Sequence, residues 1–237
     1  MQVHATGEYT PAIVADSDSL LRLWKHVGEY AGPASATVSC ADGIERKFSG
    51  LDELLAYENS LRAAAQTIEI YGRARDPDRS VSITVGCRWG ARATVSIRGE
   101  EQDVTAMRTR ILDSFAGMRA WFSPVATLDL WIFWTIIFAA FWLIVETMAP
   151  STPAARPGRS FSEALRQIGL GLSVIAPVFL LVYAVSKLRA RYFPMVSMAF
   201  GQGAKRYQTH EQVRWAVIVA FVVGLAGSAV YGVMSGT

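Results

Sequence analysis

Three long apolar runs in the second half of the chain constrain its fold more than any other feature of the sequence. They cover residues 128–148, 168–186 and 215–234. A helix of about 20 apolar residues is long enough to cross the hydrocarbon core of a bilayer. We therefore expect an integral membrane protein in which residues 123–237 form an all-α region with three transmembrane helices.

The balance of charge changes sign between the two halves of the chain. Residues 1–122 carry 14 Lys and Arg against 16 Asp and Glu, whereas residues 123–237 carry 9 against 4. The surplus of basic residues therefore belongs to the membrane half. A nucleic-acid-binding protein would carry that surplus on its folded soluble part, so we do not expect nucleic acid as a partner.

Alternating apolar and polar residues in the first half predict β-strands. The clearest runs are 68–73, 81–89 and 91–98, in which every second residue is apolar. The dipeptide Asp42-Gly43, between two further β-prone runs, predicts a hairpin. Strands with this alternation form an antiparallel sheet that has one face covered and the other exposed to water.

Amphipathic helices are expected to cover that sheet. One is predicted to begin after the capping residue Asp16 and to end before Pro33, and another to span residues 100–122, because apolar residues recur there at helical spacing. Residues 1–122 are therefore predicted to form an α+β domain, an antiparallel sheet with helices on one face. Pro124 is expected to separate this domain from the first span.

The distribution of Lys and Arg beside the spans predicts the orientation of the membrane region. Nine basic residues, from Arg108 to Arg214, lie in the approach to the first span and in the second connection, against three in the first connection. No secretory signal is visible after Met1. For a bacterial cell we expect a multi-pass inner-membrane protein with a cytoplasmic N-terminal domain and its C-terminus outside.

Small residues line one edge of the third span. Gly224, Ser228 and Gly232 recur every four residues, so a neighbouring backbone can approach closely. Three helices alone bury little surface, and we therefore expect a homo-oligomer in contact with membrane lipids. The sequence leaves open whether the edge contacts the same chain or another copy. Uncharged mid-membrane positions disfavour a carrier and leave open a pore made of several copies.

The connection before the third span is predicted to be more ordered than a simple loop. Residues 193–200 suit an extended segment, and Gly201-Gln202-Gly203 a turn. Thr209 with Gln212 resembles a capping box, which predicts that the third helix begins there. This connection is either a cytoplasmic collar that touches the soluble domain or anionic lipid, or a positive flank that only fixes the topology.

The sequence shows no catalytic or metal-binding constellation. His4, His26 and His210 belong to different predicted elements, and Cys40 and Cys87 form no CxxC pair. We therefore expect a protein that is not an enzyme and that holds no metal and no cofactor.

One exposed surface suggests a ligand. If the two clearest strands pair, Arg88, Arg92 and Arg98 project from the open face of the sheet, near Tyr71 and Arg73. Guanidinium groups beside hydroxyl groups and an aromatic ring suit a small acidic or phosphorylated ligand. The alternative is that these are ordinary solvated residues of exposed strands.

The predicted architecture resembles that of toxic membrane effectors of bacterial defence modules, in which a small sensing domain is fused to a few spans. The resemblance implies antiviral defence, with a cytoplasmic domain that senses a ligand or partner and controls a membrane-perturbing or pore-type region. The alternative function is that of a membrane anchor or scaffold subunit that recruits a soluble partner protein.

Overall fold

The computed structural model describes residues 1–74, 79–88, 91–129, 134–136, 138–139, 179–180 and 182–235. The chain divides into two compact units, one formed by Met1–Thr127 with Tyr192–Thr237 and the other by Leu128–Arg191. All elements named below belong to the first unit. The predicted spans 128–148 and 168–186 fall mostly outside the described residues.

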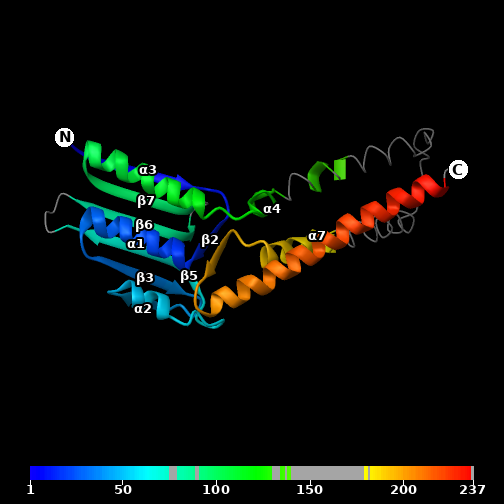
Figure 1. Cartoon of the computed structure of the whole chain (residues 1–237), viewed down its shortest axis with the longest axis horizontal. Coiled ribbons are helices and arrows are strands. Elements are labelled where there is room, and N and C mark those ends of the chain that lie inside the picture. Colours follow the sequence, from blue (N-terminus) through cyan, green and yellow to red (C-terminus); the bar gives the residue numbers. More distant parts are fainter. Residues whose placement is uncertain are drawn as a thin grey trace, which may run out of the picture. The chain divides into compact units, whose positions relative to one another are not determined.

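A six-stranded antiparallel sheet forms the frame of the first unit (Figure 1). In spatial order its strands are β1 (Gln2–Tyr9), β7 (Ala91–Glu100), β6 (Ser80–Arg88), β5 (Ala65–Arg73), β3 (Ala34–Cys40) and β4 (Glu45–Phe48). The antiparallel sheet predicted from the alternating pattern is confirmed. The predicted hairpin is also present, since Gly43, at a φ of 77°, lies in the turn between β3 and β4.

Two long helices cover one face of this sheet. The helices of the first unit are α1 (Ser17–Ala31), α2 (Leu51–Ala56), α3 (Glu101–Gly117), α4 (Ser123–Thr127) and α7 (Gln202–Ser235). As predicted, Asp16 caps α1, and its carboxylate accepts a 2.8 Å hydrogen bond from the Ser19 amide. Helix α3 ends at Gly117, not at residue 122 as predicted, because the backbone after it pairs with another strand.

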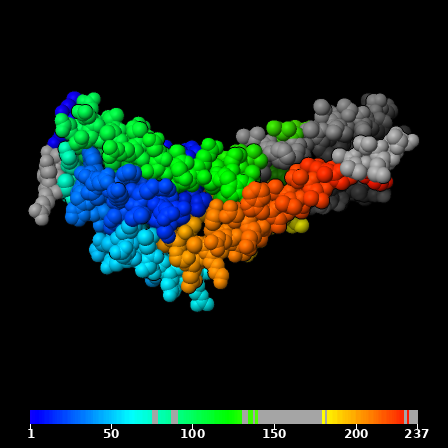
Figure 2. Space-filling view, in the orientation of Figure 1, coloured from blue at the N-terminus to red at the C-terminus, as the bar shows by residue number. Residues whose placement is uncertain are grey.

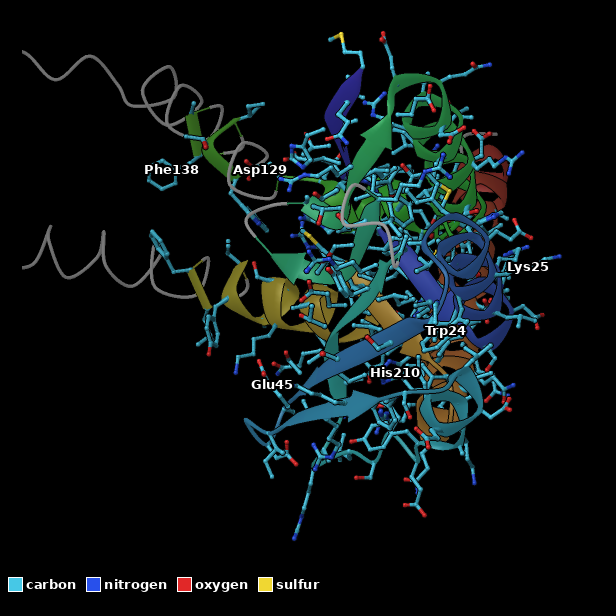
Figure 3. The ribbon with its side chains drawn as sticks, turned by 90° about the vertical axis from the view of Figure 1, so that its left-hand side faces the viewer. Trp24, Lys25, Glu45, Asp129, Phe138 and His210 are labelled. Atoms are coloured by element: carbon cyan, nitrogen blue, oxygen red, sulfur yellow. The ribbon has the colours of Figure 1, made fainter. Side chains whose placement is uncertain are left out.

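The main core lies between the sheet and helices α1 and α3. Strand residues such as Ile70 and Ile83 point toward Leu23 of α1 and Phe115 of α3, and all are fully buried. Full burial of an apolar side chain of this size contributes about 1.5–3 kcal/mol to stability. Figure 3 shows the two layers, with Lys25 on the helix side and side chains standing on both faces of the strands. The other face of the sheet is polar.

A second, two-stranded sheet was not predicted as such. It consists of β2 (Ile13–Asp16) and β8 (Val196–Ala199), which run parallel. Strand β8 lies within the predicted extended segment 193–200. Helix α7 begins at Gln202 and not at Thr209, so the capping-box prediction is wrong. The Thr209 hydroxyl donates to the Lys205 carbonyl inside the helix.

Helix α7 leaves the α+β domain with an apolar and exposed surface. Among the described helices, the stretch Gln202–Ser228 is long and apolar enough to cross a membrane. The core helix of a soluble protein would be buried, but Trp215, Phe221 and Leu225 are each more than half exposed. The third predicted span, 215–234, lies in this helix.

Candidate functional site

Strand β2 lies between the two segments that lead from the α+β domain toward the C-terminal half. On one edge it pairs with β8. On the other edge, the Val14 amide donates to the Met118 carbonyl, and the Ala120 amide donates to the Ala12 carbonyl, each at 2.8 Å. Because β2 ends at Asp16, the cap of α1, one short strand ties α1 to both segments.

We call this region the joint, formed by residues 12–16, 57–65, 118–123 and 192–215. It has a small apolar core of its own, separate from the main core. Phe122 is buried there and packs edge-on against Phe193, with ring centroids 5.8 Å apart. The buried Ser123 hydroxyl accepts a 2.9 Å hydrogen bond from the Ala12 amide. The joint is therefore packed and hydrogen-bonded, not a flexible tether.

Asn59 fastens the domain to the start of α7. Its side chain is fully buried, and its Nδ2 donates to the carbonyls of Met198 at 3.2 Å and Phe200 at 3.1 Å. Its Oδ1 accepts from the Ala65 amide at 2.9 Å and from the Arg206 guanidinium at 3.3 Å. A side-chain amide has two donor hydrogens and one acceptor oxygen, so this buried group is fully satisfied.

The turn before α7 requires glycine at two positions. Gly201 has a φ of 53°, and a Cβ there would lie 2.5 Å from the Tyr57 carbonyl oxygen. A Cβ on Gly203 would lie 2.2 Å from the Met198 carbonyl oxygen and 2.3 Å from Asn59 Nδ2. The predicted turn at these residues is therefore also a close contact with the backbone of Tyr57 and Met198. Any side chain at Gly201 or Gly203 would force these segments apart.

Arg214 is buried in the joint among aromatic rings. Its Nε donates to the Tyr192 carbonyl at 2.6 Å, and its guanidinium carbon lies 4.0 Å from the centroid of the Phe122 ring. The rings of Tyr207 and Phe193 are 5.1 and 5.9 Å away. Among the described residues, neither Nη atom has a hydrogen-bond partner. The ring faces add to the stabilisation that the Tyr192 carbonyl gives this desolvated cation, at about 2 kcal/mol for a well-placed ring.

Two tryptophans mark the outer end of the joint. Trp121 follows α3, Trp215 begins the apolar surface of α7, and their rings stack with centroids 5.4 Å apart. Both are about half exposed. Tryptophan is enriched where a membrane meets water. Figure 2 shows the first turns of α7, in orange, beside α1, in blue.

The structure brings together some of the residues predicted to bind a ligand. Tyr71, Arg73 and Arg98 lie on the open face of the sheet. Arg73 and Arg98 both pair with Ser80 of β6, one from each side, so their Cα atoms are about 10 Å apart. Arg92 lies on the same face, six residues from Arg98 and so about 20 Å away. The Arg88 side chain lies outside the described part of the chain. Ligand binding at this face stays a prediction.

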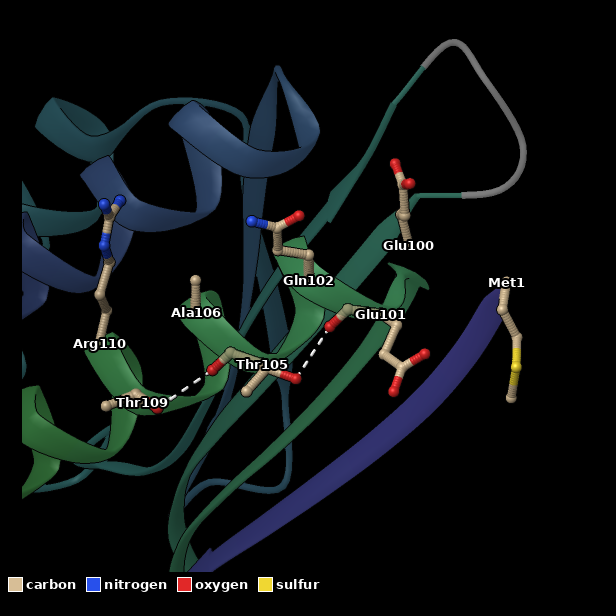
Figure 4. A pocket seen from close by; sticks show the side chains of 8 residues that line it. All are labelled: Met1, Glu100, Glu101, Gln102, Thr105, Ala106, Thr109 and Arg110. Atoms are coloured by element: carbon tan, nitrogen blue, oxygen red, sulfur yellow. Dashed lines mark hydrogen bonds between the residues drawn. The ribbon is translucent and has the colours of Figure 1, made fainter.

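A shallow hollow beside the start of α3 offers no comparable chemistry (Figure 4). Its volume is about 840 Å³. The hydroxyls of Thr105 and Thr109 donate to carbonyls one turn earlier in the helix, at 2.8 and 3.1 Å. In the part of the chain that the structure describes, no three His, Cys, Asp or Glu side chains gather as metal ligands would.

Comparison with known families bears on the C-terminal part of the chain. Residues 160–235 match a family model described as bacteriophage holin. The match covers less than half of the chain and includes the second and third predicted spans, β8 and the joint's part of α7. No curated protein and no solved structure matches the chain. With the exposed apolar surface of α7, the match indicates that this part of the chain is a membrane region.

The predicted helix-packing edge lies within the holin-matched residues. A Cβ on Gly224 would meet no atom within 4 Å among the described residues. The exposed Ser228 hydroxyl donates to the Gly224 carbonyl at 2.9 Å. Gly232 lies further along the same helix, and its surroundings are outside the described part. The role of this edge in helix packing stays a prediction.

Proposed function

We propose that this protein is an oligomeric, multi-pass inner-membrane protein whose cytoplasmic α+β domain controls a membrane-perturbing or pore-type region. The match of residues 160–235 to bacteriophage holin is the observation that carries this proposal. In the proposal the membrane region has three spans, 128–148, 168–186 and 215–234, and the chain is an effector, not an enzyme.

The surface of α7 supports the membrane part of the proposal. From Trp215 onward its large apolar side chains are exposed, among them Val219, Phe221 and Val223. A water-soluble protein seldom leaves a continuous apolar surface of this length uncovered. Lipid and further copies of the chain are the surroundings that would cover it, as expected of a protein that assembles in the bilayer.

The joint supports the control part of the proposal. The domain holds the start of α7 through Asn59 and β8, and holds the segment after α3 through β2. These contacts are backbone or buried hydrogen bonds, which resist independent movement of the pieces that they join. A shift of the α+β domain caused by a ligand or partner would therefore move α7.

The orientation rests on charge. Nine Lys and Arg flank the proposed spans on the side of the α+β domain, against three on the other. That bias favours a cytoplasmic domain and an external C-terminus.

The proposal includes a role in antiviral defence. The architecture, a small domain fused to a few spans, supports this role.

The test is the effect of the chain on a bacterial membrane. We expect induced expression of the full chain to collapse the membrane potential, measured with a potential-sensitive dye. Val222→Arg places a charge in the middle of the proposed third span and should abolish the effect, because a charge there is strongly unfavourable. Ile44→Arg, at a side chain of the domain that is 54 % exposed and lies outside the joint, is the matched control. Equal depolarisation by both variants would contradict the proposal.

The open polar face of the six-stranded sheet favours a second candidate function. Within the first unit, α1 and α3 pack on the opposite face of the sheet, and Tyr71 on the polar face is 40 % exposed. A membrane anchor or scaffold would recruit a soluble partner there. Harmless expression with co-purification of one soluble protein, lost on Tyr71→Ala and Arg98→Ala, would support this function over the first.

A further inference from the structure

The joint holds a cavity of about 490 Å³ that opens to solvent. This volume falls within the range of about 300–1,000 Å³ found for small-molecule sites. The start of α1 contributes Asp16 and Arg22 to its lining, the segment after α3 contributes Arg119 and Trp121, and α7 contributes Glu211. Every segment that passes through the joint toward the membrane region therefore lines the same cavity.

The charged groups of this cavity are not paired with one another. Arg22 donates to the Ser19 hydroxyl at 3.1 Å, and Asp16 caps α1. Within the described part of the chain, Asp16, Arg22, Arg119 and Glu211 form no ion pair, although pairs are present elsewhere on the surface. The cavity therefore offers cationic and anionic groups together, and their formal charges cancel.

The cavity lies at the level of lipid headgroups if the apolar part of α7 crosses the bilayer. Glu211 precedes Trp215 by four residues, which is about 6 Å along a helix. The polar headgroup layer on each side of a bilayer is about 5–8 Å thick. Trp121, which stacks on Trp215, is 45 % exposed at the rim of the cavity. Lipid headgroups are therefore the polar groups that this cavity meets at high concentration.

We propose that the cavity binds the headgroup of phosphatidylethanolamine, a lipid that carries a phosphate and a primary ammonium group. The inference rests on the proposed function, because it requires α7 to cross a bilayer. Arg22 and Arg119 hold the phosphate, and Asp16 and Glu211 accept hydrogen bonds from the ammonium group. Such bonds between charged partners are the strong ones.

The lining distinguishes this headgroup from those of other lipids. An anionic headgroup such as that of phosphatidylglycerol has no cation to satisfy Asp16 and Glu211. The quaternary ammonium of phosphatidylcholine has no N–H to donate to a carboxylate. Phosphatidylethanolamine satisfies both halves of the cavity. Once bound, it connects α1, the segment after α3 and α7, so occupancy stabilises the joint.

The experiment uses the full chain in detergent, titrated with short-chain phosphatidylethanolamine, phosphatidylcholine or phosphatidylglycerol. Binding is followed by the shift in melting temperature and by tryptophan fluorescence. We expect saturable binding of phosphatidylethanolamine, about tenfold tighter than either other lipid, which corresponds to one good charged hydrogen bond. Equal binding of all lipids, tighter binding of phosphatidylglycerol, or binding that does not saturate would overturn the proposal.

Variants separate the two halves of the headgroup. Arg119→Gln should weaken binding of phosphatidylethanolamine and phosphatidylcholine alike, because both carry the phosphate. The pair Asp16→Asn and Glu211→Gln should weaken phosphatidylethanolamine alone and remove its advantage, while Asn still caps α1. Arg110→Gln, at an exposed arginine of α3 outside the cavity, should change nothing. An unchanged lipid preference in the Asp16 and Glu211 pair would overturn the assignment.

Failure of this proposal is distinguishable from failure of the proposed function. If the chain releases dye from vesicles but shows no preference among lipids in the detergent titration, the headgroup site is excluded and the membrane-perturbing role remains. Selective binding of phosphatidylethanolamine without dye release or depolarisation would leave the site and remove that role.

Discussion

The rings of Trp121 and Trp215 stack with their centroids 5.4 Å apart and 26° between their planes. This contact joins the segment that leads toward the first predicted span to the first apolar turn of α7. Both segments are also held by the β2–β8 sheet. The α+β domain is therefore connected to the membrane region at two places that contact each other.

A double-mutant cycle measures how strongly these two places are coupled. We expect Trp121→Ala and Trp215→Ala to show a coupling free energy of about 1 kcal/mol, as is typical of aromatic pairs. Chemical unfolding of the full chain in detergent gives the required free energies. Trp24→Ala, on α1, combined with Trp215→Ala is the control and should be additive within about 0.5 kcal/mol. Additivity of the Trp121 and Trp215 changes would contradict the expected coupling.

Loss of the Asn59 side chain should loosen the start of α7. Asn59→Ala leaves the Met198 carbonyl and the Ala65 amide without their Asn59 partner. The Phe200 carbonyl loses one of two hydrogen bonds and keeps the one from the Gly203 amide at 2.9 Å. Each buried group left without a partner costs about 1–3 kcal/mol, and alanine at the positive φ of this position adds about 1 kcal/mol. We expect a stability loss of about 3 kcal/mol or more, with faster amide hydrogen exchange in residues 196–204. The neighbouring Ser60→Ala should change neither quantity.

A single methyl group at Gly203 should have an effect of the same kind. The Cβ of Gly203→Ala would meet the Met198 carbonyl and Asn59 Nδ2 at distances that require the backbone to move. Overpacking of this kind costs about 1–3 kcal/mol. Gly117→Ala, at the end of α3, meets no described atom within 4 Å and should be neutral or slightly stabilising. Equal melting temperatures for the two variants would contradict the close contact.

The parts of the fold with a strong local pattern could be predicted from the sequence. Strands β5, β6 and β7 have one buried and one exposed face, so their residues alternate clearly. Strand β1 was missed although it also alternates. Its inward positions include Ala5 and Gly7, which are small and weakly β-forming, so the contrast with His4 and Thr6 is low.

The joint could not be predicted because its contacts join residues far apart in the chain. Asn59 and Phe200 are separated by 141 positions, and nothing beside Asn59 marks it as a buried link. The visible signals were the extended pattern of residues 193–200 and the glycines at 201 and 203, and they indicated a strand and a turn without their partners. The capping box at Thr209 predicted the wrong start for α7. The helix begins directly after Gly201, whose positive φ ends the preceding extended segment, and a capping motif inside a helix does not change where that helix begins.

High pH should act on the joint through Tyr57. Burial raises the pKa of Tyr57 to about 12, and its hydroxyl donates to the Ala63 carbonyl. Because the folded-state pKa lies above the unfolded value of about 10, this contribution to stability is complete below pH 10 and is lost as the pH rises toward 12. Burial also raises the pKa of Tyr30 and Tyr207, so ultraviolet titration of tyrosinate should show several late-ionising groups, and one fewer in Tyr57→Phe. The same variant should lose less stability between pH 10 and 12 than the wild type.

The small-residue edge of α7 provides the test of assembly. Gly224→Leu has open space within the described part of its own chain, so the α+β domain should fold and melt as in the wild type. If copies pack at this edge, the added side chain blocks the close backbone approach, and light scattering in detergent should show the oligomer dissociating. Val222→Leu, on the opposite side of the helix, is the matched control and should keep the wild-type size and depolarising activity. A Gly224→Leu variant that stays assembled and active would place the contact between copies on another face of the membrane region.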